Sequence, residues 1–136
     1  MPLPLASALV TAVIILCSLP ALRGGFVYDD HFIAEHPLFD GVDNLLPSFI
    51  RTSHDYVPNI VETATGVLYR PLPAATFVAT NVVFGRVPLP HHLVSLALHL
   101  VISALIISLG CDLRTSRVPA LAVLAGFVYG LHPLTA

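Results

Sequence analysis

The stretch LPLASALVTAVIILCSLPAL, residues 3–22, is apolar and uncharged, and it runs directly into RGGFVYDDH, residues 23–31. A helix rises about 1.5 Å per residue, so about 20 residues cover roughly 30 Å, the thickness of the hydrocarbon core of a bilayer. Asp29 and Asp30 therefore follow a segment long enough to cross a membrane. Carboxylates are costly near lipid and usually serve a function there. The junction predicts a spanning helix followed by a functional acidic pair.

The composition of the whole chain also favours a membrane protein. Of its 136 residues, 56% are hydrophobic and only 10% are charged, against about 25% charged residues in soluble domains. The net charge is −2 and the chain contains no lysine, so it has no basic patch of the kind that binds nucleic acid. The alternative for residues 1–22, a cleaved signal peptide, fits less well because no Lys or Arg precedes the apolar run.

Two further apolar segments follow, and the short loop between them contains Arg114 and Arg117. Short loops rich in arginine remain cytoplasmic. The sequence thus predicts an α-helical integral membrane protein with about three transmembrane helices, whose long external loop carries interfacial helices. The predicted spans are 3–22, 92–110 and 119–133, and the external loop is 23–91. Three spans make a small bundle, so we expect residues 1–136 to form the N-terminal part of a longer polytopic domain.

Within the external loop, residues 72–84 form the clearest predicted helix. Thirteen mostly apolar residues are too few to span a bilayer, so this helix is expected to lie along the membrane interface. Gly85 follows the segment and is expected to end the helix. Residues 44–50 are typical of a short amphipathic turn or helix, whereas residues 54–65 show no periodicity and are expected to be irregular.

Asp29 and Asp30 are the candidate catalytic residues. A carboxylate beside an attacking hydroxyl can take up its proton, and two neighbouring carboxylates raise the pKa of one of them. Adjacent side chains point in different directions, so only one of the two is expected to act as the base. The other reading is structural, in which the pair caps a helix that starts at His31.

Arg70 and His132 are the candidate phosphate-binding residues. The planar guanidinium of Arg70 suits bidentate contact with a phosphate, and His132 ends the third predicted span on the side of the membrane where Asp29 is expected. The structural alternatives are an arginine anchored among lipid headgroups and a histidine that ends a helix before Pro133. His99, in the middle of a span, is expected to be packed and hydrogen-bonded.

A divalent metal is possible near the acidic pair, but no metal site is assigned. The acidic and histidine side chains of this region are spaced too loosely for a recognisable ligand set; they are Asp29, Asp30, His31, Glu35 and His36. Cys17 and Cys111 are expected to lie at different depths and to remain free thiols.

Four short motifs occur in a characteristic order along the chain. They are FVYDD at residues 26–30, YRPL at 69–72 followed by Asn81, HHLV at 91–94 with LHL at 98–100, and GLHP at 130–133. In this order and spacing the chain resembles the N-terminal part of the GT-C membrane glycosyltransferases, the protein O-mannosyltransferase-like group. It looks closest to the branch that carries tetratricopeptide repeats after the membrane domain.

The resemblance implies a polyprenyl-phosphate-linked sugar as donor, with mannose as the expected sugar, and a protein or glycan acceptor. Transfer would take place on the non-cytoplasmic face of a bacterial inner membrane or of the endoplasmic reticulum, with Asp29 as the base beside Asp30, and with Arg70 and His132 on the donor phosphate. The alternative is a non-catalytic membrane anchor or interaction module of a larger repeat-containing protein. A small transporter or metal-handling protein built around the histidines is the third reading.

Overall fold

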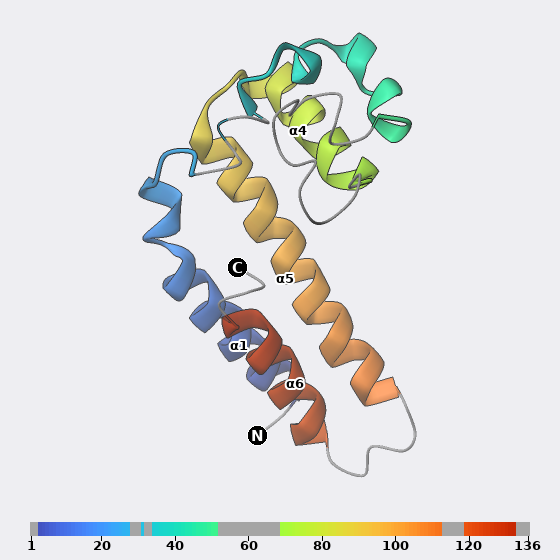
Figure 1. Cartoon of the computed structure of the whole chain (residues 1–136). Helices are drawn as coiled ribbons and strands as arrows, with labels where there is room; N and C mark the ends of the chain where they lie inside the picture. Colours follow the sequence, from blue (N-terminus) through green and yellow to red (C-terminus); the bar gives the residue numbers. More distant parts are fainter. Residues whose placement is uncertain (1–2, 28–30, 32–33, 52–68, 113–118, 133–136) are drawn as a thin grey trace, which may run out of the picture. The chain divides into compact units, whose positions relative to one another are not determined.

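The computed structural model describes residues 3–27, 31, 34–51, 69–112 and 119–132, and the part of the chain that it describes is helical without strands (Figure 1). The chain divides into two compact units, which are described separately below. The long-helix unit comprises Met1–Arg23 and His92–Ala136, and the loop unit comprises Gly24–His91. The acidic pair, Asp29 and Asp30, and the segment 54–65 lie outside the described residues.

Helix α1 (Leu3–Ser18) opens the long-helix unit and is followed by the 3-10 turn η1 (Ala21–Arg23). Two of its hydroxyl groups donate to a backbone carbonyl one turn earlier. Thr11 Oγ1 donates to Ser7 O at 3.0 Å, and Ser18 Oγ donates to Ile14 O at 2.8 Å. These two hydroxyl groups are therefore paired without water, which suits an apolar environment.

Helices α5 (Pro88–Asp112) and α6 (Pro119–Leu131) complete the set of long apolar helices. Helix α5 begins four residues before the predicted boundary at residue 92, because Pro88 and Pro90 occupy its first turn, where a missing N–H costs nothing. Among the described residues, two helical segments are long and apolar enough to cross a membrane, Pro4–Arg23 and Pro88–Asp112. Helix α6 covers only about 20 Å, so the third span remains a prediction.

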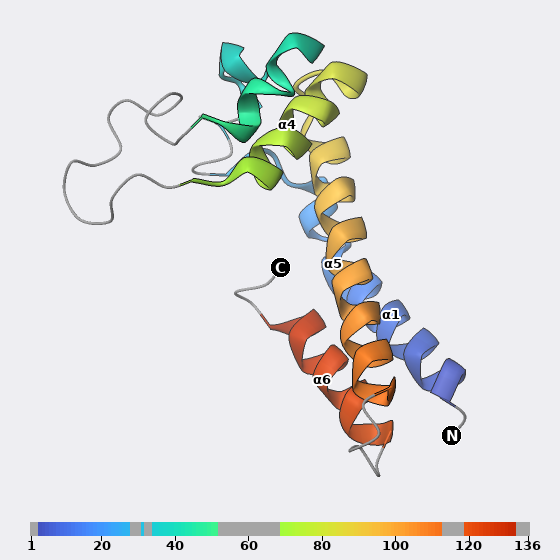
Figure 2. The same ribbon diagram turned by 90° about the vertical axis from the view of Figure 1, so that its right-hand side faces the viewer.

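Within the long-helix unit, α1 and α6 run in the same direction and α5 runs opposite to both (Figures 1 and 2). Their common core contains Val10, Ile14 and Ile107. Helix α6 approaches its neighbours closely because glycines face them: a Cβ at Gly126 would collide with the Ile107 side chain, and one at Gly130 with that of Ile14.

The outer surface of these three helices is strongly apolar. Large side chains on every helix are exposed; they include Leu9, Leu16, Val101, Leu105, Leu109, Leu121 and Val128. Contiguous apolar surface of this extent is rare in water-soluble monomers, and it suits contact with lipid. Cys17 and Cys111 are free, as predicted. Two helices of spanning length thus support membrane association.

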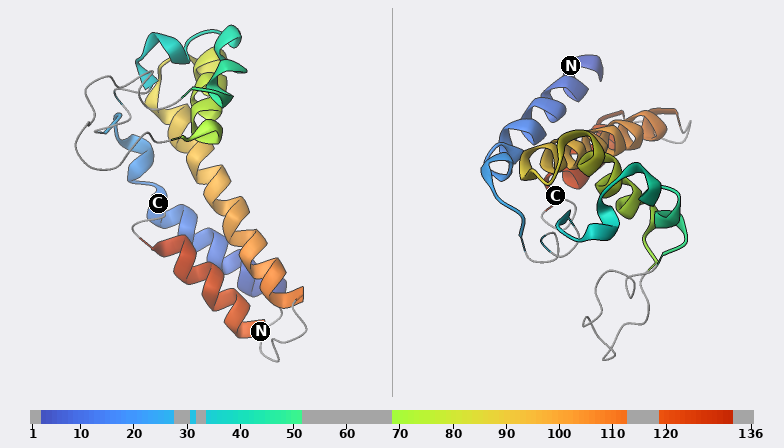
Figure 3. Two further views of the ribbon diagram at one scale, coloured as in Figure 1. Left: turned by 45° about the vertical axis from the view of Figure 1, so that its right-hand side comes forward. Right: turned by 90° about the horizontal axis from the view of Figure 1, so that it is seen from above.

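The loop unit is built on helix α4 (Pro71–Phe84), packed against three 3-10 turns, η2 (Pro37–Phe39), η3 (Val42–Asn44) and η4 (Pro47–Phe49); Figure 3 shows these turns beside α4. The predicted helix over 72–84 is confirmed to within one residue. Gly85 ends it with φ of 72°, a conformation that favours glycine. The turns found at η3 and η4 also agree with the short turn or helix predicted over residues 44–50.

The two faces of α4 differ in what they contact. One face is buried: Ala74 and Val78 pack with Phe39 in the core of the loop unit. Exposed apolar side chains on the helix include Leu72, Val82, Val83 and Phe84. The threonine hydroxyls turn back onto the helix, where Thr76 donates to Pro73 O at 2.7 Å and Thr80 to Thr76 O at 2.8 Å.

Candidate functional site

The described residues that flank the acidic pair in sequence are held in ring contacts. The ring of Phe26 lies 6.0 Å from that of His31, edge to face, and 5.3 Å from that of His91, also edge to face. Phe26 is itself buried. A buried aromatic ring with two such partners is firmly held, so the chain is anchored three residues before Asp29.

His91 and Asn81 form the buried polar centre of the loop unit. The amide nitrogen of Asn81 donates to Ala34 O at 2.9 Å and to Phe39 O at 3.3 Å. The amide oxygen is therefore left as an acceptor, and it lies 2.8 Å from His91 Nε2. This geometry assigns the hydrogen to Nε2, since only a protonated ring nitrogen can donate to the amide oxygen.

Aromatic rings enclose the same histidine. His91 is stacked on Phe77 with ring centres 5.0 Å apart, and Phe26 meets it edge-on. We call Phe26, Phe77, Asn81 and His91 the Asn81–His91 cluster. It joins three stretches that are far apart in sequence, namely residues 26–39, helix α4 and the first turn of α5. Three of the motif segments quoted above thus contribute to one buried cluster.

Sequence reasoning missed the role of His91. No buried role was predicted for either His91 or Asn81, but each is only 7% exposed. No local pattern marks this pair, because ten residues and a helix break separate its members. The one available signal was that both residues fall in motifs of the family resemblance.

Arg70 stands directly before α4, with an exposed side chain that makes no capping hydrogen bond to the helix. The first turn of α4 contains Pro71 and Pro73, which have no N–H. Few backbone donors are therefore available to an anion at this helix end. The Arg70 guanidinium carries up to five N–H donors beside this helix end.

His132 follows α6 directly, and its N–H donates to Tyr129 O at 3.3 Å. Its side chain is exposed. Arg70 belongs to the loop unit and His132 to the long-helix unit. The grouping of the two around one phosphate remains a prediction.

The residues considered for a metal are partly engaged with one another. His31 Nδ1 and Glu35 Oε1 lie 3.0 Å apart across one helical turn, on an exposed surface. His36 Nδ1 accepts a hydrogen bond from Leu38 N at 3.2 Å and so caps η2. Among the described residues no group of three potential ligands could hold a metal ion.

An exposed ion pair links Asp40, at the end of η2, to Arg86, after α4. Arg86 Nε donates to Asp40 Oδ1 at 3.1 Å, and a second, parallel hydrogen bond joins Nη2 to Oδ2. The hydrogen bond from Arg86 holds the pKa of Asp40 below its ordinary value. This bidentate pair was not foreseen, since 46 residues separate its members.

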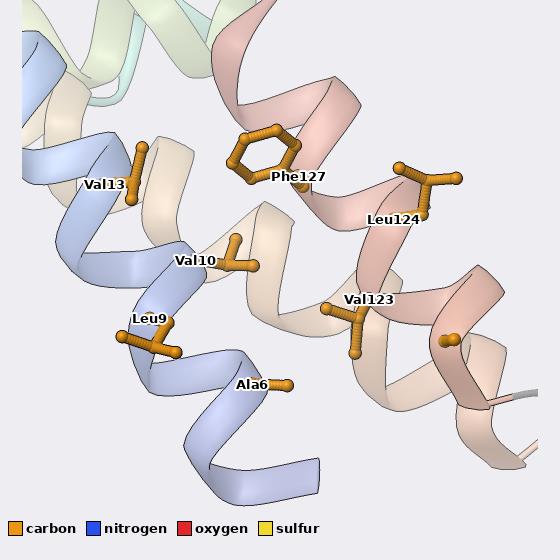
Figure 4. A pocket seen from close by; sticks show the side chains of 8 residues that line it. Ala6, Leu9, Val10, Val13, Val123, Leu124 and Phe127 are labelled. Atoms are coloured by element: carbon orange, nitrogen blue, oxygen red, sulfur yellow. The ribbon is translucent and has the colours of Figure 1, made fainter. Parts of the chain in front are cut away.

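In the long-helix unit, His99 is packed and hydrogen-bonded as predicted. Its Nε2 lies 3.0 Å from Gly130 O, and its ring is stacked on Tyr129 with centres 5.1 Å apart. Hollows also lie between the helices of this unit. One is an apolar groove of about 330 Å³ between α1 and α6, lined by side chains such as Leu9, Val123 and Phe127 (Figure 4). The other, of about 310 Å³, has a partly polar lining.

Comparison of the chain with protein-family models, with curated proteins and with solved structures finds no match.

Proposed function

We propose that the chain is the N-terminal part of a membrane glycosyltransferase of the GT-C type. It would move a sugar, mannose in our proposal, from a polyprenyl-phosphate donor to an acceptor hydroxyl on the non-cytoplasmic face of the membrane. The observation that most supports this is the Asn81–His91 cluster. A buried network of hydrogen bonds and rings anchors the segment that leads into the acidic pair, and positioned groups are what catalysis requires.

The proposed placement in the membrane follows from the apolar surfaces. Helices α1 and α5 have spanning length, and we propose that α6 is the outward end of a third span. In this arrangement the loop unit lies on the non-cytoplasmic side. The exposed apolar residues of α4, including Leu72 and Val83, would rest at the boundary between headgroups and acyl chains.

The proposed reaction is a direct displacement with inversion. The acceptor oxygen bonds to the anomeric carbon while the bond from that carbon to the phosphate oxygen breaks. The acceptor proton passes to the carboxylate of Asp29, and polyprenyl phosphate leaves with the electron pair. Asp30 would position the acceptor. Arg70 and His132 would bind the phosphate as its charge increases, which is the stage at which fixed donors contribute most.

Transfer from a labelled polyprenyl-phosphate mannose by membranes containing the full-length protein tests this proposal. Asp29→Asn keeps the size of the side chain but removes the base, so turnover should fall by roughly 10²- to 10⁴-fold at unchanged protein abundance. Asp43→Asn is the matched control, since Asp43 is an exposed carboxylate of the same unit; this variant should keep full activity. A larger loss for Asp30→Asn would exchange the two roles.

Unchanged transfer in the double variant of Asp29 and Asp30 would show that the pair is structural. Absence of transfer by the wild-type protein from any polyprenyl-phosphate sugar would favour the alternative, a non-catalytic membrane anchor or interaction module.

A further inference from the structure

Residues 27–30, which we call the acidic segment, are flanked on both sides by described residues of the loop unit. Phe26 precedes the segment and is 8% exposed, and His31 follows it. The rings of these two residues meet edge to face, with their centres 6.0 Å apart. The two ends of the acidic segment are therefore close together, and both belong to one packed unit.

The first end of the acidic segment is held by His91. The ring of Phe26 meets that of His91 edge-on with centres 5.3 Å apart, and His91 is stacked on Phe77 at 5.0 Å. His91 is 7% exposed, so its ring has little room to move in a closely packed interior. Aromatic pairs of this geometry stabilise beyond the burial of their surface. Phe26 thus depends on the His91 ring for its position.

The second end is held by Asn81. The His31 carbonyl accepts a hydrogen bond from Glu35 N at 3.2 Å, and Ala34, just before Glu35, is fully buried. The Ala34 carbonyl accepts from the amide nitrogen of Asn81 at 2.9 Å. The oxygen of the same amide accepts from His91 Nε2 at 2.8 Å. The turn that follows the acidic segment is therefore fixed to the same hydrogen-bonded pair that holds its first end.

A buried polar pair is not needed for stability alone. Replacing both members of such a pair with apolar groups of the same shape can be nearly neutral, and the unit already has an apolar core in Phe39, Ala74 and Val78. What a fully paired polar network adds is one defined geometry, because hydrogen bonds depend on direction. That property matters most beside groups that have to be placed accurately.

We propose that Asn81 and His91 are positioning residues, which hold the two ends of the acidic segment and so set the place of its two carboxylates. Both residues are buried and act through others, His91 through Phe26 and Asn81 through Ala34. The consequence for catalysis rests on the transfer reaction proposed above. The holding of the two ends does not, so it is measured separately from activity.

Two variants of His91 separate the two ends. His91→Phe keeps a ring against Phe26 but removes the donor to Asn81, whose amide can then rotate away from Ala34. His91→Gln keeps a donor at the place of Nε2 but removes the ring.

Each end has its own measurement on the full-length protein in phosphatidylcholine nanodiscs. Chymotrypsin cleavage after Phe26 reports on the first end, since a buried ring has to be released before the protease can bind it. Hydrogen–deuterium exchange of the Glu35 amide, followed by mass spectrometry, reports on the second. His91→Gln should speed the cleavage about 2- to 10-fold, the loss expected for one aromatic pair. His91→Phe should speed the exchange about 2- to 10-fold, the loss expected for one hydrogen bond.

Val78→Ala is the matched control, because it removes part of a core side chain of the same unit and keeps both positioning residues. A general weakening of the unit should change the cleavage and the exchange by similar factors. If both His91 variants also change the two rates by similar factors, or change neither, the proposal that the pair holds two separate ends is wrong.

The transfer assay then tests the catalytic consequence. Both His91 variants should lower kcat, by up to about 10²-fold for a displacement of about 1 Å, and leave KM for the donor unchanged because His91 does not bind it. Val78→Ala should keep kcat at a temperature where it is folded. Unchanged kcat in both His91 variants, or a raised KM alone, would overturn the positioning role. Absence of transfer by the wild-type protein would overturn the proposed function instead, and the cleavage and exchange rates would still decide whether the two ends are held.

Discussion

Both polar atoms of the Asn81 amide form hydrogen bonds inside the loop unit. The nitrogen donates to the carbonyls of Ala34 and Phe39, and the oxygen accepts from His91 Nε2. All three partners would otherwise be buried polar groups far apart in the sequence. A single side chain thus replaces backbone pairing that this irregular segment cannot supply for itself.

Asn81→Ala should strongly destabilise the loop unit, because it removes three buried hydrogen bonds and each contributes about 0.5–1.5 kcal/mol. Val82→Ala, at an exposed neighbouring position, is the control and should have little effect. Limited proteolysis of the purified protein across a temperature series measures both. Equal resistance of the two variants would show that the Asn81 hydrogen bonds do not stabilise the unit.

The Asp40–Arg86 pair predicts a specific dependence on pH. The pKa of Asp40 lies below its ordinary value of 3.8 because Arg86 donates hydrogen bonds to the carboxylate. A carboxyl group with a lowered pKa stabilises the folded state above pH 3.8, and this contribution disappears as the pH falls through the lowered value. At pH 7 the wild-type protein should therefore have a higher melting temperature than Asp40→Asn. The difference between the two melting temperatures should narrow only below pH 3.8.

Thermal melts of the two proteins between pH 7 and pH 2.5 measure that gap. Both partners are partly exposed, so salt should reduce the gap as well. A gap that already closes between pH 6 and pH 5 would assign the stabilisation to a histidine instead, since only histidine ordinarily titrates in that range.

At the scale of the helices, α6 packs through a row of small residues as well as through the larger side chains of Val123, Phe127 and Leu131. Ala122, Gly126 and Gly130 recur every four residues and are buried, and a Cβ at Gly126 would also lie 3.2 Å from Ser103 O. Such spacing lets helices approach closely in lipid, where helix association depends on van der Waals packing.

Gly126→Val should therefore disrupt the packing of α6, because the added side chain meets Ile107 and the α5 backbone. Overpacking of this kind costs about 1–3 kcal/mol. Ala125→Val places the same side chain on the exposed face of α6 and should be tolerated. Thermal stability of the two variants in detergent compares them directly. A lower melting temperature for Ala125→Val than for Gly126→Val would contradict the packing described here.

The sequence predicted where the helices lie better than it predicted which residues contact one another. Apolar length identified α1 and α5, and a mostly apolar run followed by Gly85 located α4 within one residue. The bond between Asn81 and His91 was not predictable, because it depends on how a helix break turns one segment back onto another. The candidate site divides in the same way: Arg70 was placed correctly at the head of α4, whereas the buried role of His91 appeared only in the structure.

At the scale of the whole molecule, the proposed placement in a membrane depends on α5. This helix is the one long apolar connection between the residues of the loop unit and Arg114, and by length and composition it can cross a bilayer. If it crosses, the loop unit and Arg114 lie on opposite sides. The short arginine-containing loop then sets the direction, because such loops stay in the cytoplasm.

Single cysteines at positions 43 and 114, introduced after Cys17→Ser and Cys111→Ser, test this placement in intact cells. A maleimide that cannot cross membranes should modify Asp43→Cys from outside the cytoplasm, since Asp43 is exposed. Arg114→Cys should react only after the cells are opened. Reaction of both from the same side would show that α5 does not cross the membrane. Reaction in the opposite order would keep the span but reverse it, and would place Asp29 on the cytoplasmic face, away from the proposed acceptor.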